Sequence, residues 1–282
     1  MYEPTISRYY LVPKVLRFLQ GMILVMVLSS VPQFFGLIYA LIAVPLIFYL
    51  YKKGLFRPAV QIVLLVLSTL LGFLIFAPVL PYQFQQVLFG EIRKLGMPLE
   101  AILFFLFLFI LLTVIGGRAY CSAVCPIGAI QELLSKVPTP KIAIPWKRSV
   151  LIIHIVVFVL FVWFALFFPN FQFKCIGMKY FFFLEYTSVK FYLFAGIMLL
   201  GLFIYRPFCR FICPYGLFLT LASYFSLMRL TRTDACISCK QCEKVCPVGE
   251  AYADSNKSEC FLCGRCTQVC PVKGALVYQK RK

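Results

Sequence analysis

The sequence predicts a mainly α-helical, polytopic membrane bundle that is followed by a small α+β domain. Three observations support this fold class. Of the 282 residues, 62% are hydrophobic and only 13% are charged, which is far outside the range of soluble globular domains. Several apolar runs approach the roughly 20 residues that an α-helix needs to cross a bilayer. After residue 228 the aliphatic runs stop, the charge rises and the cysteines take up a regular spacing.

We expect about six membrane spans. Their approximate ranges are 16–32, 34–51, 59–80, 99–117, 149–168 and 189–206. The first pair allows two arrangements, either two short helices or a hairpin that does not fully cross, because Pro32 and Gly36 favour a break between them. Residues 1–14 lack the small-residue cleavage site of a signal peptide, so we expect the first apolar run to stay in the protein.

The basic residues are distributed unequally between the two sides of this predicted topology. Segments on the side of the N-terminus hold 13 lysines and arginines before residue 229, whereas the opposite loops hold five. This positive-inside bias predicts a multi-pass protein of the bacterial inner membrane with both termini in the cytoplasm. The net charge of +18 therefore indicates contact with anionic membrane lipid. Nucleic acid is not an expected partner, because the aromatic residues lie mostly inside the spans.

Residues 229–282 contain two copies of the pattern C-x2-C-x2-C-x3-C-P, written CISCKQCEKVCP and CFLCGRCTQVCP in this chain. This is the bacterial ferredoxin run, in which three cysteines bind one [4Fe–4S] cluster and the fourth binds the other cluster of a two-cluster domain. The first cluster is thereby assigned to Cys236, Cys239, Cys242 and Cys270. The second is assigned to Cys260, Cys263, Cys266 and Cys246. We therefore divide the chain into a transmembrane domain at 1–228 and a cytoplasmic, ferredoxin-like α+β domain with two [4Fe–4S] clusters at 229–282.

Two other uses of these cysteines fit the sequence less well. Pairs of C-x2-C also build structural zinc sites, but two complete four-cysteine runs are typical of clusters. A disulfide framework is not expected in the reducing cytoplasm, where the predicted topology places this domain.

A second cysteine pattern occurs twice within the predicted membrane domain. The segments GRAYCSAVCPIG and YRPFCRFICPYG, at residues 117–128 and 205–216, align without gaps, and each follows a predicted span. The repeat gives a candidate third site with the cysteines Cys121, Cys125, Cys209 and Cys213. Four interpretations stay open: one iron–sulfur cluster held by all four, two redox-active dithiols, another metal or a haem, or buried cysteines that pack like small apolar side chains.

The residues beside these cysteines have roles of their own. Pro126 and Pro214 suit the first turn of a helix, because proline lacks the N–H that is unsatisfied there in any case. Arg118 and Arg206 precede the cysteine pairs and allow two interpretations. The first is pairing with lipid headgroups, and the second is stabilising negative charge on a thiolate cluster.

The chain as a whole resembles the NapH/MauN family of ferredoxin-type membrane proteins. The resemblance is carried by the apolar spans, the paired C-x3-C-P motifs and the two C-terminal cysteine runs, and it covers most of the chain. The linker between the two runs is shorter than is usual for a bacterial two-cluster ferredoxin. The membrane parts of NosR and CcoG look related. The resemblance implies membrane electron transfer, often linked to the quinone pool, in support of a partner redox protein.

We therefore expect an integral membrane iron–sulfur protein that passes single electrons between the quinone pool and a partner redox enzyme or carrier. His154, the only histidine, is the candidate quinone contact, and a hydrogen-bonded structural histidine is the ordinary alternative. Two alternative functions are an accessory factor that supplies electrons to mature another enzyme's metal site and an anchoring subunit of a larger redox complex. The sequence shows no nucleotide-binding, haem-attachment or nucleophile–base motif, so no substrate-converting site is expected.

Overall fold

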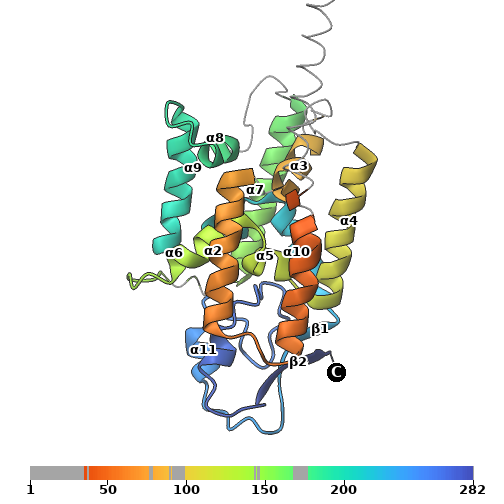
Figure 1. Cartoon of the computed structure of the whole chain (residues 1–282), viewed down its shortest axis with the longest axis vertical. Coiled ribbons are helices and arrows are strands. Elements are labelled where there is room, and N and C mark those ends of the chain that lie inside the picture. Colours follow the sequence, from red (N-terminus) through yellow and green to blue (C-terminus); the bar gives the residue numbers. More distant parts are fainter. Residues whose placement is uncertain are drawn as a thin grey trace, which may run out of the picture.

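The computed structural model describes residues 35–281, except for 37, 76–78, 89, 91–98, 143, 145–146 and 168–176. A helical part is followed by a small cysteine-rich domain that lies against one end of the helices (Figure 1). The C-terminus belongs to this small domain. The predicted span at 16–32 lies outside the described residues.

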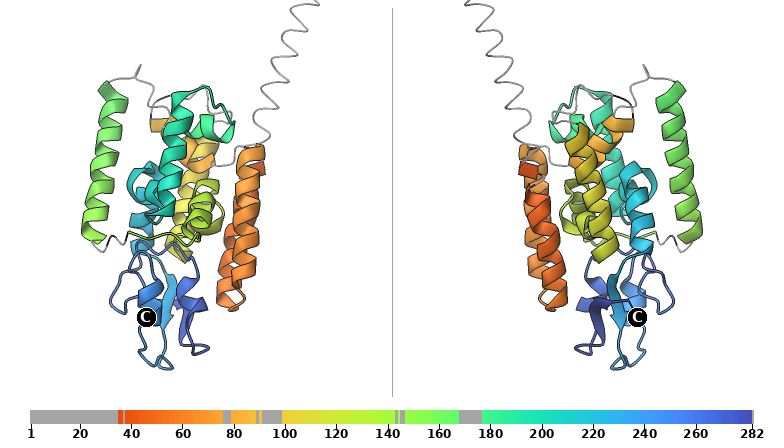
Figure 2. Two further views of the ribbon diagram at one scale, coloured as in Figure 1. Left: turned by 90° about the vertical axis from the view of Figure 1, so that its left-hand side faces the viewer. Right: turned by 90° about the vertical axis from the view of Figure 1, so that its right-hand side faces the viewer.

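Long apolar helices form most of the helical part. Their bounds are Ile38–Lys52, α2 at Pro58–Ile75, α4 at Leu99–Gly116, α7 at Lys147–Phe167 and α9 at Val189–Leu199, which continues into the 3₁₀ helix η3 at Leu200–Leu202. They run roughly side by side, with α7 on one flank and α2 on the other (Figure 2). A shorter helix, α3 at Val79–Leu88, precedes α4. The long helices coincide with the five predicted spans that fall within the described residues.

One of these helices has the length and composition of a membrane span. Among the described residues, α4 alone is both long and apolar enough to cross a bilayer, with a mean hydropathy of 2.7 over 18 residues. Just 28% of those residues are buried inside the protein, whereas the core helix of a soluble protein is mostly buried. Within the other long helices, the apolar stretches with described side chains span 10–17 residues each, at Ile38–Lys52, Pro58–Leu74, Arg148–Phe164 and Val189–Leu202. The mainly helical fold is confirmed, and the six-span count stays a prediction.

Each cysteine repeat bends the chain through a short helix into a second helix that begins at proline. In the first repeat α5 (Ala119–Ala123) leads into α6 (Pro126–Ser135), and in the second the π-helical η4 (Phe208–Ile212) leads into α10 (Pro214–Tyr224). Proline occupies the first turn of both α6 and α10, as predicted from its missing N–H. Between the repeats, α8 (Met178–Phe182) packs against α9.

The small domain is framed by a two-stranded antiparallel sheet. Its strands are β1 (Met228–Arg232) and β2 (Leu276–Lys280), and their pairing places the first residue of β1 opposite the last of β2. Between the strands lie two short helices, α11 (Gln241–Val245) and α12 (Arg265–Gln268), one in each cysteine run. The domain therefore has the α+β character that the sequence predicts.

A buried ionic cluster joins the two parts of the chain. Glu132, on α6, is fully buried and accepts hydrogen bonds from Arg206 at 3.1 Å, Tyr205 at 2.7 Å and Arg265 at 2.9 Å. Arg206 is equally buried, whereas Arg265 belongs to α12 of the small domain. Although burial alone raises the pKa of the Glu132 carboxyl, the two guanidinium groups outweigh it and hold that pKa below its usual range.

Other polar contacts along the same boundary fix the orientation of the small domain. The hydroxyl of Tyr278 on β2 donates to the carbonyl oxygen of Gly116 at the end of α4, at 2.7 Å. Arg210 on η4 pairs with Glu259 at 3.1 Å, and both side chains are almost fully buried. The boundary is therefore a dry, polar junction.

Replacing Glu132 with glutamine should destabilise the protein strongly, because Arg206 and Arg265 lose a buried counter-charge. Breaking a buried ion pair from one side costs about 3–5 kcal/mol. Glu243→Gln is the matched control, since its pair with Arg232 is partly exposed and such pairs contribute about 0–1 kcal/mol. Guanidinium-induced unfolding, followed by tryptophan fluorescence, gives the free energy of unfolding of both variants and of the native protein. Equal losses would show that the Glu132 cluster does not hold the two parts together.

Candidate metal centres

The outer cysteine cavity is lined by the first predicted ligand set, Cys236, Cys239, Cys242 and Cys270. It has a volume of about 20 Å³ and lies at the surface of the small domain, where Cys239 is exposed and Cys242 is buried. The Arg232 guanidinium donates to the sulfur of Cys242 at 3.6 Å. Cys270 comes from the second cysteine run, so this cavity brings together cysteines of both runs, and their joint binding of one cluster stays a prediction.

The inner cysteine cavity is lined by the second predicted set, Cys246, Cys260, Cys263 and Cys266. Its volume is about 350 Å³, because the space extends past the cysteines along β1 and the loop at 250–257. The backbone N–H of Glu250 donates to the sulfur of Cys246 at 3.2 Å. The structure thus gathers each predicted set around its own cavity, and cluster ligation by these sulfurs stays a prediction.

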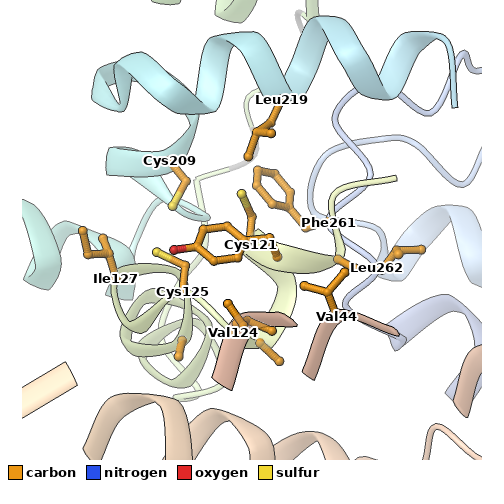
Figure 3. Close-up of a cluster of buried hydrophobic side chains, with 14 of the residues drawn as sticks. Val44, Cys121, Val124, Cys125, Ile127, Cys209, Leu219, Phe261 and Leu262 are labelled. Atoms are coloured by element: carbon orange, nitrogen blue, oxygen red, sulfur yellow. The ribbon is translucent and has the colours of Figure 1, made fainter. Parts of the chain in front are cut away.

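The repeat cavity is lined by the cysteines of the two C-x3-C-P motifs, Cys121, Cys125, Cys209 and Cys213. All four are buried, with exposed fractions between 4% and 7%. Figure 3 shows Cys121 and Cys125 of the first repeat and Cys209 of the second repeat turned toward a common centre. The two repeats therefore face each other, as their alignment suggested.

The glycine of each C-P-x-G segment permits a close approach within its own repeat. A Cβ atom on Gly128 would lie 2.5 Å from the carbonyl oxygen of Cys121, and one on Gly216 would lie 3.0 Å from that of Cys209. The backbone N–H of Gly216 also donates to the sulfur of Cys213 at 3.3 Å. The glycine lets the second helix of each repeat fold back over the first cysteine, which explains why the motif extends beyond the proline.

The two arginines of the repeats are buried inside the protein, so their interpretation as lipid-headgroup contacts is wrong. Arg118 is 1% exposed and Arg206 is 0% exposed. Each reaches the opposite repeat: Arg206 donates to the carbonyl oxygens of Cys121 and Ser122, and Arg118 donates to that of Gly216 at 3.5 Å. The crossed arrangement ties the two repeats together around the cavity.

Arg118 carries a buried positive charge for which the described residues provide no carboxylate partner. Its Nε lacks a hydrogen-bond partner, and the side chain lines the repeat cavity beside the four thiols. Burial raises the pKa of Cys125 to about 12 and also raises those of Cys209 and Cys213, so as free thiols these three cysteines would stay neutral and leave the charge uncompensated. Metal-bound thiolates are deprotonated, and a buried charge requires a partner. A negatively charged iron–sulfur group among the four sulfurs therefore fits this cavity.

A single metal ion and an iron–sulfur cluster require different arrangements of the cysteines. Within residues 35–281, apart from the gaps given above, no three His, Cys, Asp or Glu side chains are arranged to hold one ion. A zinc ion would need its ligand sulfurs about 2.3 Å from one centre. A [4Fe–4S] cluster binds each cysteine through a different iron and so accepts a wider set.

One loop of the small domain lies between the inner cavity and the repeat cavity. Phe261 is 1% exposed and lines the inner cavity, and the guanidinium carbons of Arg118 and Arg206 lie 4.1 and 4.8 Å from its ring centroid. A ring face attracts such cations. The carbonyl oxygen of the next residue, Leu262, accepts a hydrogen bond from Ser122 of α5 at 3.0 Å. Phe261 therefore connects the cysteine run of the small domain to both repeats.

Sequence reasoning missed two residues of this junction, Glu132 and Phe261. Glu132 carried a usable signal, because it is the single carboxylate in the apolar segment PIGAIQELLSKV that follows the first repeat. Phe261 carried none, since it occupies a variable position of a C-x-x-C pair and its partners lie far away in the sequence.

His154, the candidate quinone contact, lies on α7 and is 3% exposed. Its Nε2 is 2.8 Å from the carbonyl oxygen of Cys213. A carbonyl can only accept, so Nε2 carries the proton in this hydrogen bond. The structure thus gives His154 the bond expected of a structural histidine, and a quinone contact at this residue stays a prediction.

Comparison with protein families agrees with the cysteine chemistry. A family of 4Fe–4S binding domains matches residues 98–145 and 191–232, which include all four cysteines of the repeat cavity. A second family of 4Fe–4S binding domains matches residues 231–249, in the first cysteine run. The fold and these cavities therefore define a 4Fe–4S binding protein.

Curated relatives narrow the class further. The methylamine utilization ferredoxin-type protein MauN of Methylobacillus flagellatus is 26% identical over 58% of this chain and 57% of its own length. YccM of Escherichia coli, whose name refers to electron transport, is 26% identical over 49% of this chain and 44% of its own length. An uncharacterized protein of Methanocaldococcus jannaschii is 26% identical over 49% of this chain and 62% of its own length.

The chain thus spans about half the length of the curated relatives it matches. No solved structure matches it. The shared 4Fe–4S domains and these relatives confirm the predicted resemblance to ferredoxin-type proteins of the NapH/MauN kind.

Iron and acid-labile sulfide should be counted in anaerobically purified protein. With [4Fe–4S] clusters in all three cavities, the expected content is about twelve of each per chain. The C121S/C209S variant should retain about eight, because it removes one ligand from each repeat and leaves the tail intact. A native content of about eight, together with free alkylation of the four repeat thiols, would contradict a cluster in the repeat cavity.

Arg118→Met should lower the reduction potential of the group in the repeat cavity, because the reduced form carries more negative charge and loses a buried cation. We expect a shift of about 60 mV or more, which is tenfold in the one-electron equilibrium. Lys136→Met is the control, since Lys136 lies at the far end of α6 and bonds to Gln61 at 3.2 Å. Potentiometric titration, monitored by electron paramagnetic resonance, gives the reduction potential of both variants. A rise, or equal shifts, would contradict this role of Arg118.

Proposed function

We propose that the chain is an iron–sulfur protein of the bacterial inner membrane, multi-pass with both termini in the cytoplasm. In this proposal it passes single electrons between a partner redox enzyme or carrier and the quinone pool. The observation that carries the proposal is the order of the three cavities, from exposed Cys239 at the outer cavity, through the inner cavity, to the buried repeat cavity. Bound [4Fe–4S] clusters supply reversible one-electron chemistry.

Side chains that the protein leaves uncovered support the membrane position. On α4, Phe104 and Phe107 are 60% and 65% exposed. On α7, Val159, Leu166 and Phe167 are 57%, 70% and 65% exposed. Soluble monomers rarely expose contiguous apolar surface of this kind, so lipid is the expected cover. The basic residues counted from the sequence support a position of the small domain on the cytoplasmic side.

The inner and repeat cavities are connected by the chain's own side chains. Cys260 lines the inner cavity, and the next residue is Phe261, whose ring lies against Arg118 and Arg206. These two arginines hold backbone carbonyls of both repeats. Phe261 and the two arginines are at most 1% exposed, so the contact excludes water. An electron that passes between the two cavities along this contact does not cross solvent.

The repeat cavity is the end of the route that lies among the helices. His154 of α7 donates to the carbonyl oxygen of Cys213, so a quinone bound beside His154 would be adjacent to this cavity. The maturation function foreseen from the sequence would use the same route with a different acceptor. The names of MauN, a ferredoxin-type protein, and YccM, an electron transport protein, support electron transfer in both cases.

The function is tested by reoxidation of the dithionite-reduced protein in anaerobic liposomes. Decylubiquinone, a soluble quinone analogue, should restore the visible spectrum of the oxidised protein, and His154→Leu should slow that step while the iron content is unchanged. Failure of the quinone to reoxidise the native protein would contradict quinone as the acceptor. Colourless, iron-free protein would contradict electron transfer altogether.

Phe261→Leu should slow electron exchange between the inner and repeat cavities roughly tenfold, because the ring contact with both arginines is lost while most apolar volume remains. Phe261→Tyr keeps the ring and should behave like the native protein. Phe56→Leu is the matched control, since Phe56 is also buried near the small domain and stacks on Tyr51. Rapid-freeze electron paramagnetic resonance after mixing with reductant gives the rates, with iron content as a check. Equal rates in the native protein and Phe261→Leu would remove Phe261 from the route.

A further inference from the structure

The two cysteine runs of the small domain carry equivalent C-x-x-C loops. The residue before the second cysteine has a left-handed backbone in both, with φ of 55° at Ser238 and 48° at Leu262. The residue after that cysteine also has a left-handed backbone in both loops, with φ of 58° at Lys240 and 75° at Gly264. A short helix follows each loop, α11 in the first run and α12 in the second. The two loops therefore share one conformation.

The environments of the two loops are opposite. Phe261 and Leu262 of the second loop are 1% and 3% exposed, because the loop docks on the chain's own helices. At the equivalent positions of the first loop, Ile237 is 66% exposed and Ser238 is exposed too. The first loop therefore presents to solvent an apolar side chain at the position that its twin uses for docking.

Of the two loops, only the first carries exposed lysines. Lys240 and Lys244 are exposed, and the equivalent positions of the second run hold Gly264 and Gln268. Lys273, three residues after the fourth cysteine that lines the outer cavity, is exposed as well. The lysines are therefore a feature of the free loop and are not required by the shared loop conformation.

Two carboxylates near this loop leave the surface basic. Glu243 is paired with Arg232 at 2.5 Å, so its charge is compensated. Asp234 is the exposed acid that precedes the first cysteine of the run. Three exposed lysines against one exposed aspartate give the surface around Ile237 a net positive charge.

We propose that Ile237, with Lys240, Lys244 and Lys273, forms the docking surface for an acidic one-electron carrier protein. The proposal rests on the electron-transfer function proposed above and assigns the outer cavity as the site that meets the soluble carrier. The apolar side chain provides contact area, and the lysines attract the acidic face of the carrier and raise the association rate. One electron leaves the reduced carrier, which is oxidised, and reduces the iron–sulfur group at the outer cavity. No bond is formed or broken.

The test uses the native full-length protein and the K244E/K273E variant, with a reduced acidic flavodoxin as the probe. The second-order rate constant for reduction should fall about tenfold or more in the variant at low salt, and its salt dependence should become weaker. Methyl viologen radical cation serves as a second reductant of opposite charge, which should react with the variant at least as fast as with the native protein. K52E/K53E is the matched control, because these exposed lysines give the same change of charge at the end of the first described helix.

The apolar part of the surface is tested separately. Ile237→Ser should weaken the reaction with flavodoxin at high salt, where the lysines are screened, and Ile237→Leu should restore it. Equal rates for the native protein and both loop variants, or an equal loss in K52E/K53E, would overturn the docking proposal. So would reduction by viologen without any reduction by flavodoxin. A protein that neither reductant reduces would instead overturn the proposed electron-transfer function.

Discussion

The burial of two arginine side chains at the junction between the helices and the small domain constrains the rest of the structure. A guanidinium group does not lose its proton in a protein, so buried arginine demands negative charge or an aromatic face. Glu132 provides the charge for Arg206, and Phe261 provides the ring for both arginines. Arg118 is left facing four thiols. The helices, the small domain and the repeat cavity are therefore held by one electrostatic arrangement.

Two internal duplications meet at this junction, the pair of C-x3-C-P repeats and the pair of cysteine runs. In each pair, the two copies differ from one another at the junction. In the first helical repeat Gly117 adopts φ of 78°, whereas in the second Arg206 itself adopts φ of 51°. This conformation is costly for a residue with a Cβ, and the bonds of Arg206 to Glu132 and to the first repeat offset the cost. In the cysteine runs the backbone is shared and the surroundings differ. Duplication thus supplies two copies of a loop, and packing gives them separate uses.

The sequence predicts those features that depend on local spacing. Cysteine runs, proline at the start of α6 and α10, and apolar helices follow from residues close together in the chain. The pair of Glu132 with Arg265 joins residues 133 positions apart, so no local pattern indicates it. Arg118 was open to a headgroup interpretation because an arginine after an apolar run usually marks a membrane edge. Only the fold shows that the chain turns back after each repeat and buries the arginine of that repeat.

The predicted exchange of fourth cysteines would couple the stability of the small domain to oxygen. Cys239 is exposed at the outer cavity, so the outer site is the one that a diffusing oxidant reaches first. Its fourth cysteine, Cys270, closely follows α12, and α12 carries the Arg265 that pairs with Glu132. Damage at the solvent face would therefore release the segment that anchors the tail. In an aerobic cell, oxidation of the outer site would therefore loosen the small domain and expose it to proteases, in addition to removing the chromophore.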